Sequence, residues 1–465
     1  MITWFMVVVG AVTLAVWSVV FLDHVRLSAH ASNAASRGES WTLVHWIIGL
    51  AWAFGVLPSV LGLLRSGRQG NQFTVVAATG LPAHVATALS GVLVFFCCRL
   101  ILQHLHKPTA ASIGYLGAFL APWFALVVLS GYNAGYLTGR QFFVYPVIAV
   151  AFWLSSPPLD VARTVGILAA VTAIASMLLA LVSQLPLVNG GPAGSGKAII
   201  GHGPLLLAGP YSDANGFALT LALAAPAALL IQRTGPRIAA LSSIGLALLW
   251  SAGRTSLIAA TAGIAVYFVT QGRSWRALRG IGLTAAVVGV GLVVLTPLLE
   301  KSPTAFTSRG AVWTASLADW QHHHLWLGGG PFYFERSELL SYLFSFNILA
   351  GHNLVVDTLV RGGIVGILAL AALVTALIRR SVYLSRFSAF PLAFAITFIF
   401  GSWLEVPLSV TNLGSLGYAC WLPLALIIFA KRDLGEAPEP SLVATARHGQ
   451  NAAREPFISG WSSWA

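Results

Sequence analysis

Long apolar segments recur along nearly the whole chain, each separated from the next by a short polar stretch. Most approach the ~20 residues that a helix needs to cross the hydrocarbon core of a bilayer. Because backbone groups in lipid must pair within their own segment, the pattern predicts helices. The long segments are 2–22, 43–64, 81–103, 112–131, 162–184, 214–232, 279–299, 353–378, 387–407 and 415–430, and the shorter ones are 141–156, 237–252 and 255–270. We therefore expect an all-α polytopic membrane protein with about 12 transmembrane helices, or about 13 if every short segment crosses.

The composition supports a membrane location. Of the 465 residues, 57% are hydrophobic and 9% are charged, and the mean hydropathy is +0.81. A soluble domain carries about a quarter charged residues, so this chain lacks the charge to cover a globule in water. The net charge of +12 comes partly from short arginine-rich loops. We find no basic patch interleaved with aromatic residues and expect no nucleic-acid partner.

The distribution of arginine predicts the orientation, because cytoplasmic loops of membrane proteins are enriched in Lys and Arg. The clearest basic stretches are 233–237, 273–279, 379–386 and 431–432. They place the C-terminus in the cytoplasm and leave segments 185–213, 251–256 and 300–352 outside. With 13 spans the N-terminus would lie outside, and with 12 it would lie inside.

Five regions follow from this pattern. Residues 1–184 form the N-terminal transmembrane helices, and 185–299 form further transmembrane helices with outward loops. Residues 300–352 form a long outside loop, and 353–432 the C-terminal transmembrane helices. The polar, Ala/Pro-rich residues 433–465 form a disordered cytoplasmic tail.

The loop 300–352 is the longest polar segment between spans, and loops beyond ~15 residues are usually functional or disordered. Its many aromatic residues favour an ordered structure at the headgroup layer. Thr307 or Ser308 can cap a helix that runs to about Trp320. We predict a hinge at 328–330 and a second short helix over 335–346. The loop would thus be a helical lid, and the plainer alternative is an interfacial cover without a chemical role.

Several cations lie on the outer side. Arg254 stands between two short apolar runs, where an arginine is costly unless it faces water or an anion. The alternative for Arg254 is that its side chain extends to the interface. Arg309 lies at the predicted start of the loop helix, where backbone N–H groups favour an anion. Lys197 and Arg336 are further outside cations, or simply solvated charges. Together such side chains suit a diphosphate.

Two motifs are misleading. Residues 191–197 match G-x-x-x-x-G-K, but Ala198 stands where a phosphate-binding loop needs Ser or Thr. Such a loop also needs a preceding buried strand and a following helix in a βαβ unit, whereas this segment lies between predicted membrane spans. We therefore reject ATP binding. The run 322–324 consists of three histidines, but consecutive helical residues point about 100° apart and cannot converge on one ion. We expect no metal site and no cofactor.

A histidine stands where the outside loop re-enters an apolar helix. His352 and Asn353 are followed by nine residues and then by Gly363 and Gly366. Glycines at this spacing let helices approach closely. The plain interpretation of the histidine is that it caps the helix.

Three ionisable residues lie within or beside the last spans. Asp357 and Arg361 are four residues apart, which predicts an ion pair on one helix face. Glu405 is an isolated carboxylate near the outer end of a span. Acids in such places are functional candidates, although Glu405 could also be a partner of Arg254 or Arg361.

In this order and topology the segments resemble the O-antigen ligase and polymerase superfamily, over roughly residues 200–430. One departure lies at 253–255, Gly-Arg-Thr, where the family usually has a small residue, Ser, Arg and Gly. The segments that carry the resemblance are Tyr211-Ser212-Asp213-Ala214-Asn215, Ser251-Ala252-Gly253-Arg254, Arg309-Gly310-Ala311-Val312-Trp313, Leu327-Gly328-Gly329-Gly330, and His352-Asn353 with Gly363 and Gly366.

The resemblance implies a GT-C-type membrane glycosyltransferase, an O-antigen ligase of lipopolysaccharide biosynthesis. It would act on the periplasmic face of the bacterial inner membrane and be surrounded by membrane lipid. It would move O-antigen polysaccharide from undecaprenyl pyrophosphate to the lipid A–core with inversion at the transferred sugar. The pyrophosphate bond supplies the energy, so neither ATP nor a nucleotide sugar is implied. A metal is not expected either, because the outward segments hold no Asp-x-Asp pair for Mg²⁺.

The resemblance also implies roles for residues. His352 would be the catalytic base, since histidine commonly accepts protons near neutral pH. Arg254 and Arg309 would bind the pyrophosphate of the donor. Gly363 and Gly366 form the structural part of the motif. The supporting candidates are Asn353, Lys197, Arg336, Asp213, Asn215 and Glu405.

Three other functions stay open from the sequence. A repeat-unit polymerase would use the same donor with another lipid-linked chain as acceptor. A protein O-oligosaccharyltransferase would use Ser or Thr side chains, although such relatives often carry more C-terminal sequence. A multi-span transporter would have inverted repeats with broken helices at the midplane, whereas the polar residues here cluster at one face.

Overall fold

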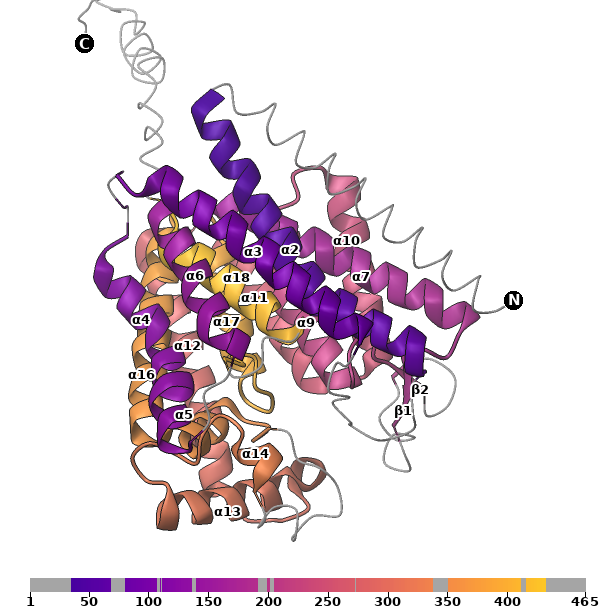
Figure 1. Ribbon diagram of the computed structural model, residues 1–465, viewed down its shortest axis with the longest axis vertical. Coiled ribbons are helices and arrows are strands. Elements are labelled where there is room, and N and C mark those ends of the chain that lie inside the picture. Colours follow the sequence, from indigo (N-terminus) through magenta and orange to yellow (C-terminus); the bar gives the residue numbers. More distant parts are fainter. Residues whose placement is uncertain are drawn as a thin grey trace, which may run out of the picture. The chain divides into compact units, whose positions relative to one another are not determined.

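The computed structural model describes residues 35–67, 80–106, 109, 111–135, 139–190, 199–200, 205–271, 273–337, 350–410 and 415–431 (Figure 1). The chain divides into two units, residues 1–430 and 431–465, and the first is described below. The described residues are mostly helical.

The helices and strands follow the chain in this order. The first part holds α2 (Ala35–Ser66), α3 (Leu81–His104), α4 (Ile113–Trp123), the π-helix η1 (Phe124–Leu129), α5 (Ser130–Asn133), α6 (Gly139–Ser155), the 3-10 helix η2 (Leu159–Ala162), α7 (Arg163–Val182), β1 (Leu187–Asn189) and β2 (Leu205–Leu207). The second part holds α9 (Ala214–Ala228), α10 (Thr234–Ser251), α11 (Arg254–Thr270), α12 (Trp275–Leu299), α13 (Ala305–His323), α14 (Tyr333–Arg336), α16 (Leu354–Leu384), α17 (Phe390–Gly401) and α18 (Ser415–Phe429).

Among the described residues, 6 helices are long and apolar enough to cross a membrane, as expected of a polytopic membrane protein. They are Thr42–Arg65, Leu81–His104, Ile113–Asn133, Leu159–Val182, Ala277–Leu299 and Leu354–Leu384. Shorter apolar helices of 10–17 residues are Phe143–Ser155, Ala214–Ala228, Arg254–Thr270, Phe390–Gly401 and Gly417–Phe429. The expected first span, 2–22, lies outside the described residues, and the total of 12 or 13 stays a prediction.

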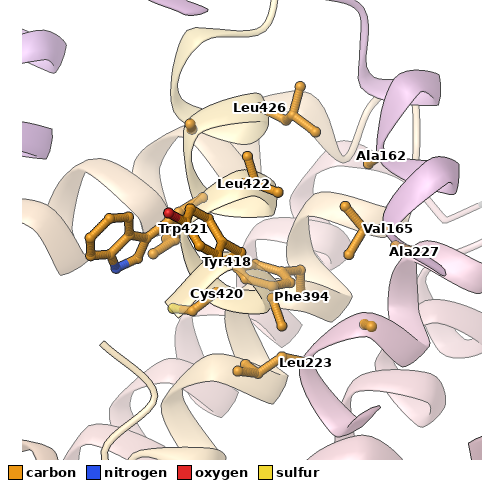
Figure 2. Close-up of a cluster of buried hydrophobic side chains, with 14 of the residues drawn as sticks. Ala162, Val165, Leu223, Ala227, Phe394, Tyr418, Cys420, Trp421, Leu422 and Leu426 are labelled. Carbon is orange, nitrogen blue, oxygen red and sulfur yellow. The ribbon is translucent and has the colours of Figure 1, made fainter. Parts of the chain in front are cut away.

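Burial inside the protein explains two of the short helices, α9 and α18. Nearly every residue of α9 is buried, and the described part of α18 is buried as well. A helix that is apolar on all sides belongs in an interior rather than at a surface. Figure 2 shows this core, where Tyr418, Trp421 and Leu422 of α18 lie among side chains from α7, α9 and α17. Protein therefore surrounds these helices on most sides, and neither needs the length that lipid contact would demand.

Close helix approach and buried hydrogen bonds hold the first helices to this core. At Gly166 of α7, an added Cβ would lie 2.4 Å from the backbone N of Ala228 in α9, so a small residue is required there. His45 Nδ1 lies 2.8 Å from Thr164 Oγ1, and the indole N–H of Trp52 donates to Thr172 at 3.1 Å. These two contacts join α2 to α7 through polar groups that lipid could not satisfy.

The mostly helical structure agrees with the expected all-α class, and one short two-stranded sheet is added to it. Segment 185–213 contains β1 and β2, which pair antiparallel with Leu187 opposite Leu207. Leucine-rich stretches on either side of a glycine-rich connection can pair in this way, because each strand satisfies the backbone groups of the other. The glycine-rich stretch was predicted as a loop, and the two strands that flank it were not predicted.

The span Ile113–Asn133 and helix α16 both depart from regular helical geometry. The span contains the π-helix η1, which begins two residues after Pro122, and a proline cannot donate the usual helical hydrogen bond. Helix α16 is kinked at Gly363, which has φ 64° and ψ −159°. As Figure 1 shows, α13 and α14 lie beside α16, and they share a buried cluster with it that includes Trp313, Phe334 and Val360.

The close approach of α7 and α9 gives a first prediction. Gly166→Ala would press a methyl group into the α9 backbone and should lower the thermal unfolding midpoint in detergent, because overpacking costs about 1–3 kcal/mol. Gly117→Ala in α4 is the control, since nothing lies within 4 Å of an added Cβ there. An unchanged midpoint for Gly166→Ala, measured beside this control, would contradict the packing described here.

Candidate functional site

The start of α16 is fixed by the side chain of Asn353, which is 0% exposed. Its Oδ1 accepts hydrogen bonds from the backbone N–H groups of Val355 and Val356, at 2.9 and 3.0 Å. Its Nδ2 donates to the carbonyls of Val293 and Trp403, both at 2.9 Å. An amide side chain offers two donors and an acceptor oxygen, so these contacts use both of its ends. Asn353 therefore caps α16 and ties it to α12 and to the segment after α17.

His352 directly precedes this cap and adopts a left-handed backbone conformation, with φ 48°. Its side chain is 37% exposed, and Nδ1 lies 4.0 Å from Oε2 of Glu405. A residue other than glycine rarely adopts positive φ unless its surroundings impose it. The imidazole is thus accessible on one side and faces a carboxylate on the other.

Glu405 is the centre of the charged site. Arg309 NH2 donates to Glu405 Oε1 at 2.7 Å, and Arg309 NH1 donates to the Leu404 carbonyl. Both side chains are 13% exposed. Burial acts to raise the pKa of the Glu405 carboxyl, but the charge of Arg309 and the contact with His352 outweigh it, so the pKa lies below its ordinary value. Glu405 therefore carries a negative charge between an arginine and the candidate base.

An unusual left-handed turn directly precedes Arg309 and places it at this position. We expected Thr307 or Ser308 to cap the loop helix, but Phe306, Thr307 and Ser308 are all left-handed, and regular helix begins after them. The cap prediction is wrong, because the N-cap residue of α13 is Thr304 and its side chain makes no capping hydrogen bond. Gly310 packs closely onto Ser302, where an added Cβ would lie 2.1 Å from the Ser302 carbonyl oxygen. Beyond the turn, regular helix runs to His323 and confirms the predicted element.

Asp213 lies close enough to this site to interact with it electrostatically. It is the N-cap of α9, and its Oδ1 accepts from the Gly216 N–H at 2.7 Å. Burial is the main cause that raises the pKa of its carboxyl, the charge of Glu405 raises it further, and His352 acts in the opposite direction. Asn215 is half-buried in the first turn of the same helix. Asp213 and Glu405 are both candidates from the sequence, but nothing in the sequence indicates that they lie near the same histidine, His352.

Arg254 begins α11 and is exposed. The preceding Ala252 is left-handed, and an added Cβ on Gly253 would lie 2.5 Å from Ala218 of α9. Arg254 therefore stands beside the N-terminal turns of α9, which also carry Asp213. Lys197 lies outside the described residues, as do the side chain of Arg336 and most of the second helix predicted over 335–346.

Gly363 allows the loop segment 325–330 to dock into α16. An added Cβ on Gly363 would lie 2.2 Å from the Trp326 carbonyl oxygen, and one on Gly366 would lie 3.1 Å from the Thr358 carbonyl oxygen. The backbone N–H groups of Gly329 and Gly330 donate to carbonyls of α16. The predicted hinge at 328–330 is therefore a docked segment, because its backbone supplies donors that the kinked helix lacks.

The histidine run forms a separate cluster. His323 Nδ1 lies 2.9 Å from Asp319 Oδ1, and the Tyr333 hydroxyl donates to Asp319 Oδ2 at 2.5 Å. Burial first, and then the hydrogen bond to Asp319, raise the pKa of Tyr333 well above its ordinary value. Across the described ranges, no group of three or more His, Cys, Asp or Glu side chains is arranged to hold a metal ion.

The lowered pKa of Glu405 gives a second prediction. The stability that this carboxylate contributes is fully present above the ordinary pKa of glutamate and is lost as pH falls through the lowered value. Glu405→Gln should therefore reduce the unfolding midpoint near neutral pH, and the difference from the wild type should shrink in acid. Glu300→Gln, at the end of α12, is the control carboxylate. A Glu405→Gln difference that stays constant to the lowest pH at which both proteins fold would contradict the charge assignment.

Comparison with known proteins adds one finding to this geometry. No curated protein and no solved structure matches the chain. Residues 238–371 match the model of the family described as O-antigen ligase, and the matched stretch contains Arg254, Arg309 and His352. This match confirms the resemblance to the O-antigen ligase superfamily and indicates a membrane glycosyl-transfer enzyme of the O-antigen ligase or polymerase type.

Proposed function

We propose that the protein is an O-antigen ligase, which transfers O-antigen polysaccharide from undecaprenyl pyrophosphate to a sugar hydroxyl of the lipid A–core. One observation carries the proposal: the stretch that matches the family contains a half-exposed histidine held against the Arg309–Glu405 ion pair. A general base needs an accessible nitrogen and a neighbour that stabilises its protonated form, and His352 has both.

The transfer step needs one proton acceptor and one leaving group. The oxygen of the acceptor hydroxyl forms a bond to the anomeric carbon of the donor sugar, while the bond from that carbon to the pyrophosphate oxygen breaks, with inversion. The electron pair of the broken bond leaves with the pyrophosphate. The hydroxyl proton goes to Nε2 of His352, because Nδ1 faces Glu405. The carboxylate then stabilises the imidazolium, as a charge placed in advance can do without reorganisation.

The arginines contribute in different ways. Arg254 is exposed at the N-terminal end of α11, where its guanidinium and the helix dipole both favour an anion. Arg309 is bonded to Glu405 and Leu404, which engages some of the five N–H donors of a guanidinium. We propose that Arg254 binds the pyrophosphate directly and that Arg309 adds positive charge beside it while keeping Glu405 in place.

The membrane setting favours two lipid-linked reactants. Donor and acceptor are both held in the bilayer, so the protein has to align molecules that already meet on one surface. The positive-inside pattern supports a periplasmic site in the bacterial inner membrane, with the C-terminus in the cytoplasm. Neither ATP nor a metal ion has a part in the proposed step, because the pyrophosphate bond supplies the driving force.

The role of His352 gives a third prediction. His352→Ala and His352→Gln should both abolish transfer in reconstituted membranes, because neither side chain can accept the hydroxyl proton, while protein level and donor binding stay near normal. His323→Gln, an exposed histidine of α13, is the control and should retain activity. Near-normal transfer by His352→Gln would exclude histidine as the base.

A fourth prediction separates the ligase from its alternatives and uses a null mutant. Lipopolysaccharide without O-antigen, together with accumulated lipid-linked O-antigen, is the result expected for a ligase. Lipopolysaccharide that carries single repeat units would instead identify a polymerase. Normal lipopolysaccharide with loss of glycosylated proteins would identify a protein O-oligosaccharyltransferase, and complementation with the wild-type chain controls for polar effects.

A further inference from the structure

The backbone of Gly351, just before His352, is held through both its N–H and its carbonyl. The Gly351 N–H donates to Asp357 Oδ1 at 2.9 Å, and the Gly351 carbonyl accepts from the indole N–H of Trp313 at 2.9 Å. An added Cβ on Gly351 would lie 2.9 Å from the Asp357 backbone N. These contacts hold the backbone on the N-terminal side of His352, and the Asn353 cap holds it on the C-terminal side.

Asp357 is itself part of the predicted ion pair, which the structure confirms. Arg361 Nε lies 3.2 Å from the Asp357 carboxylate, and the Arg361 side chain is 4% exposed. Arg361 also donates to the Pro331 carbonyl, lies 3.4 Å from Glu335 Oε2, and stands over the Phe334 ring at 5.1 Å. Arg361 therefore connects segment 331–335 of the loop to Asp357, and Asp357 in turn accepts the hydrogen bond from Gly351.

The same loop docks into the break of α16. Gly329 and Gly330 donate to the carbonyls of Val360 and Arg361 at 2.8 and 3.1 Å, and Ser130 Oγ also donates to the Arg361 carbonyl. In return, Ile364 and Val365 donate to the carbonyls of Leu325 and Trp326, at 3.0 and 3.2 Å. The kink at Gly363 would otherwise leave these backbone groups without helical partners, so loop docking and the shape of α16 depend on each other.

We infer that Asp357 and Trp313 are positioning residues, which hold the backbone N–H and carbonyl of Gly351 so that His352 keeps its left-handed backbone and its place beside Glu405. Arg361 links this arrangement to the docked loop 325–335, so the base is in place only when the loop is docked. The inference rests on the proposed function, because it assigns a role relative to His352. A left-handed conformation is unfavourable for a residue with a side chain, so neighbouring contacts must impose it.

The test uses two variants that keep most of the packing. Trp313→Phe removes the indole N–H and retains an aromatic ring, and Asp357→Asn keeps an oxygen acceptor for Gly351 but loses the charge that faces Arg361. We expect kcat to fall by about 10–100-fold, the scale on which a base misplaced by ~1 Å loses activity, with the KM for the lipid-linked donor little changed. Trp52→Phe is the matched control, because it also removes a buried indole hydrogen bond, to Thr172, but far from His352 in the chain.

The measurements are transfer by the full-length protein in proteoliposomes, with kcat and KM determined separately, and the thermal midpoint of each variant. A merely structural role predicts that Trp313→Phe and Trp52→Phe lose stability alike and keep the wild-type kcat, and this result would overturn the inference. A kcat lowered only in Trp313→Phe and Asp357→Asn supports it. His352→Gln is assayed in parallel. Normal transfer by that variant would contradict the proposed function itself, whereas an inactive His352→Gln with a wild-type kcat in Trp313→Phe would contradict only the positioning role.

Discussion

The candidate site depends on the burial of one amide side chain at the start of α16. Asn353 caps that helix and at the same time holds the carbonyls of Val293 and Trp403, so α12, α16 and the segment after α17 meet at one point. Glu405 lies two residues beyond Trp403, and His352 immediately precedes the cap. Because a buried amide without partners costs several kcal/mol, this junction has few alternative geometries. The histidine and its carboxylate are brought together by the helix cap.

Charge balance explains why several ionisable groups can lie close to the membrane. Two buried ion pairs lie in the part of this region that the structure describes: Arg309 pairs with Glu405, and Arg361 pairs with Asp357. Paired charges avoid most of the penalty that isolated ones would incur in an apolar setting. Arg254 is exposed at the start of α11, and it is the residue that we propose to bind the pyrophosphate.

The sequence predicted much of this architecture because its signals are local. Span lengths, the loop helix and the Asp357–Arg361 pair follow from spacing along one helix, and the order of short segments carried the resemblance. The features that the sequence could not predict depend on contacts between segments that are distant in the chain. Nothing near Glu405 indicates that it meets Arg309, which is separated from it by 96 residues. The left-handed turn before Arg309 and the docking of 328–330 arise from tertiary contacts that override local preferences for a cap and a hinge.

The central claim is that the outer end of α16 is where glycosyl transfer takes place. It is tested most directly by determining the structure of the protein in lipid nanodiscs with a bound undecaprenyl-pyrophosphate donor. The account predicts the pyrophosphate in contact with the Arg254 guanidinium, and the anomeric carbon of the first sugar on the side of His352 that faces away from Glu405. A donor bound at the arginine-rich stretches 233–237 or 379–386, with His352 remote from the sugar, would contradict it.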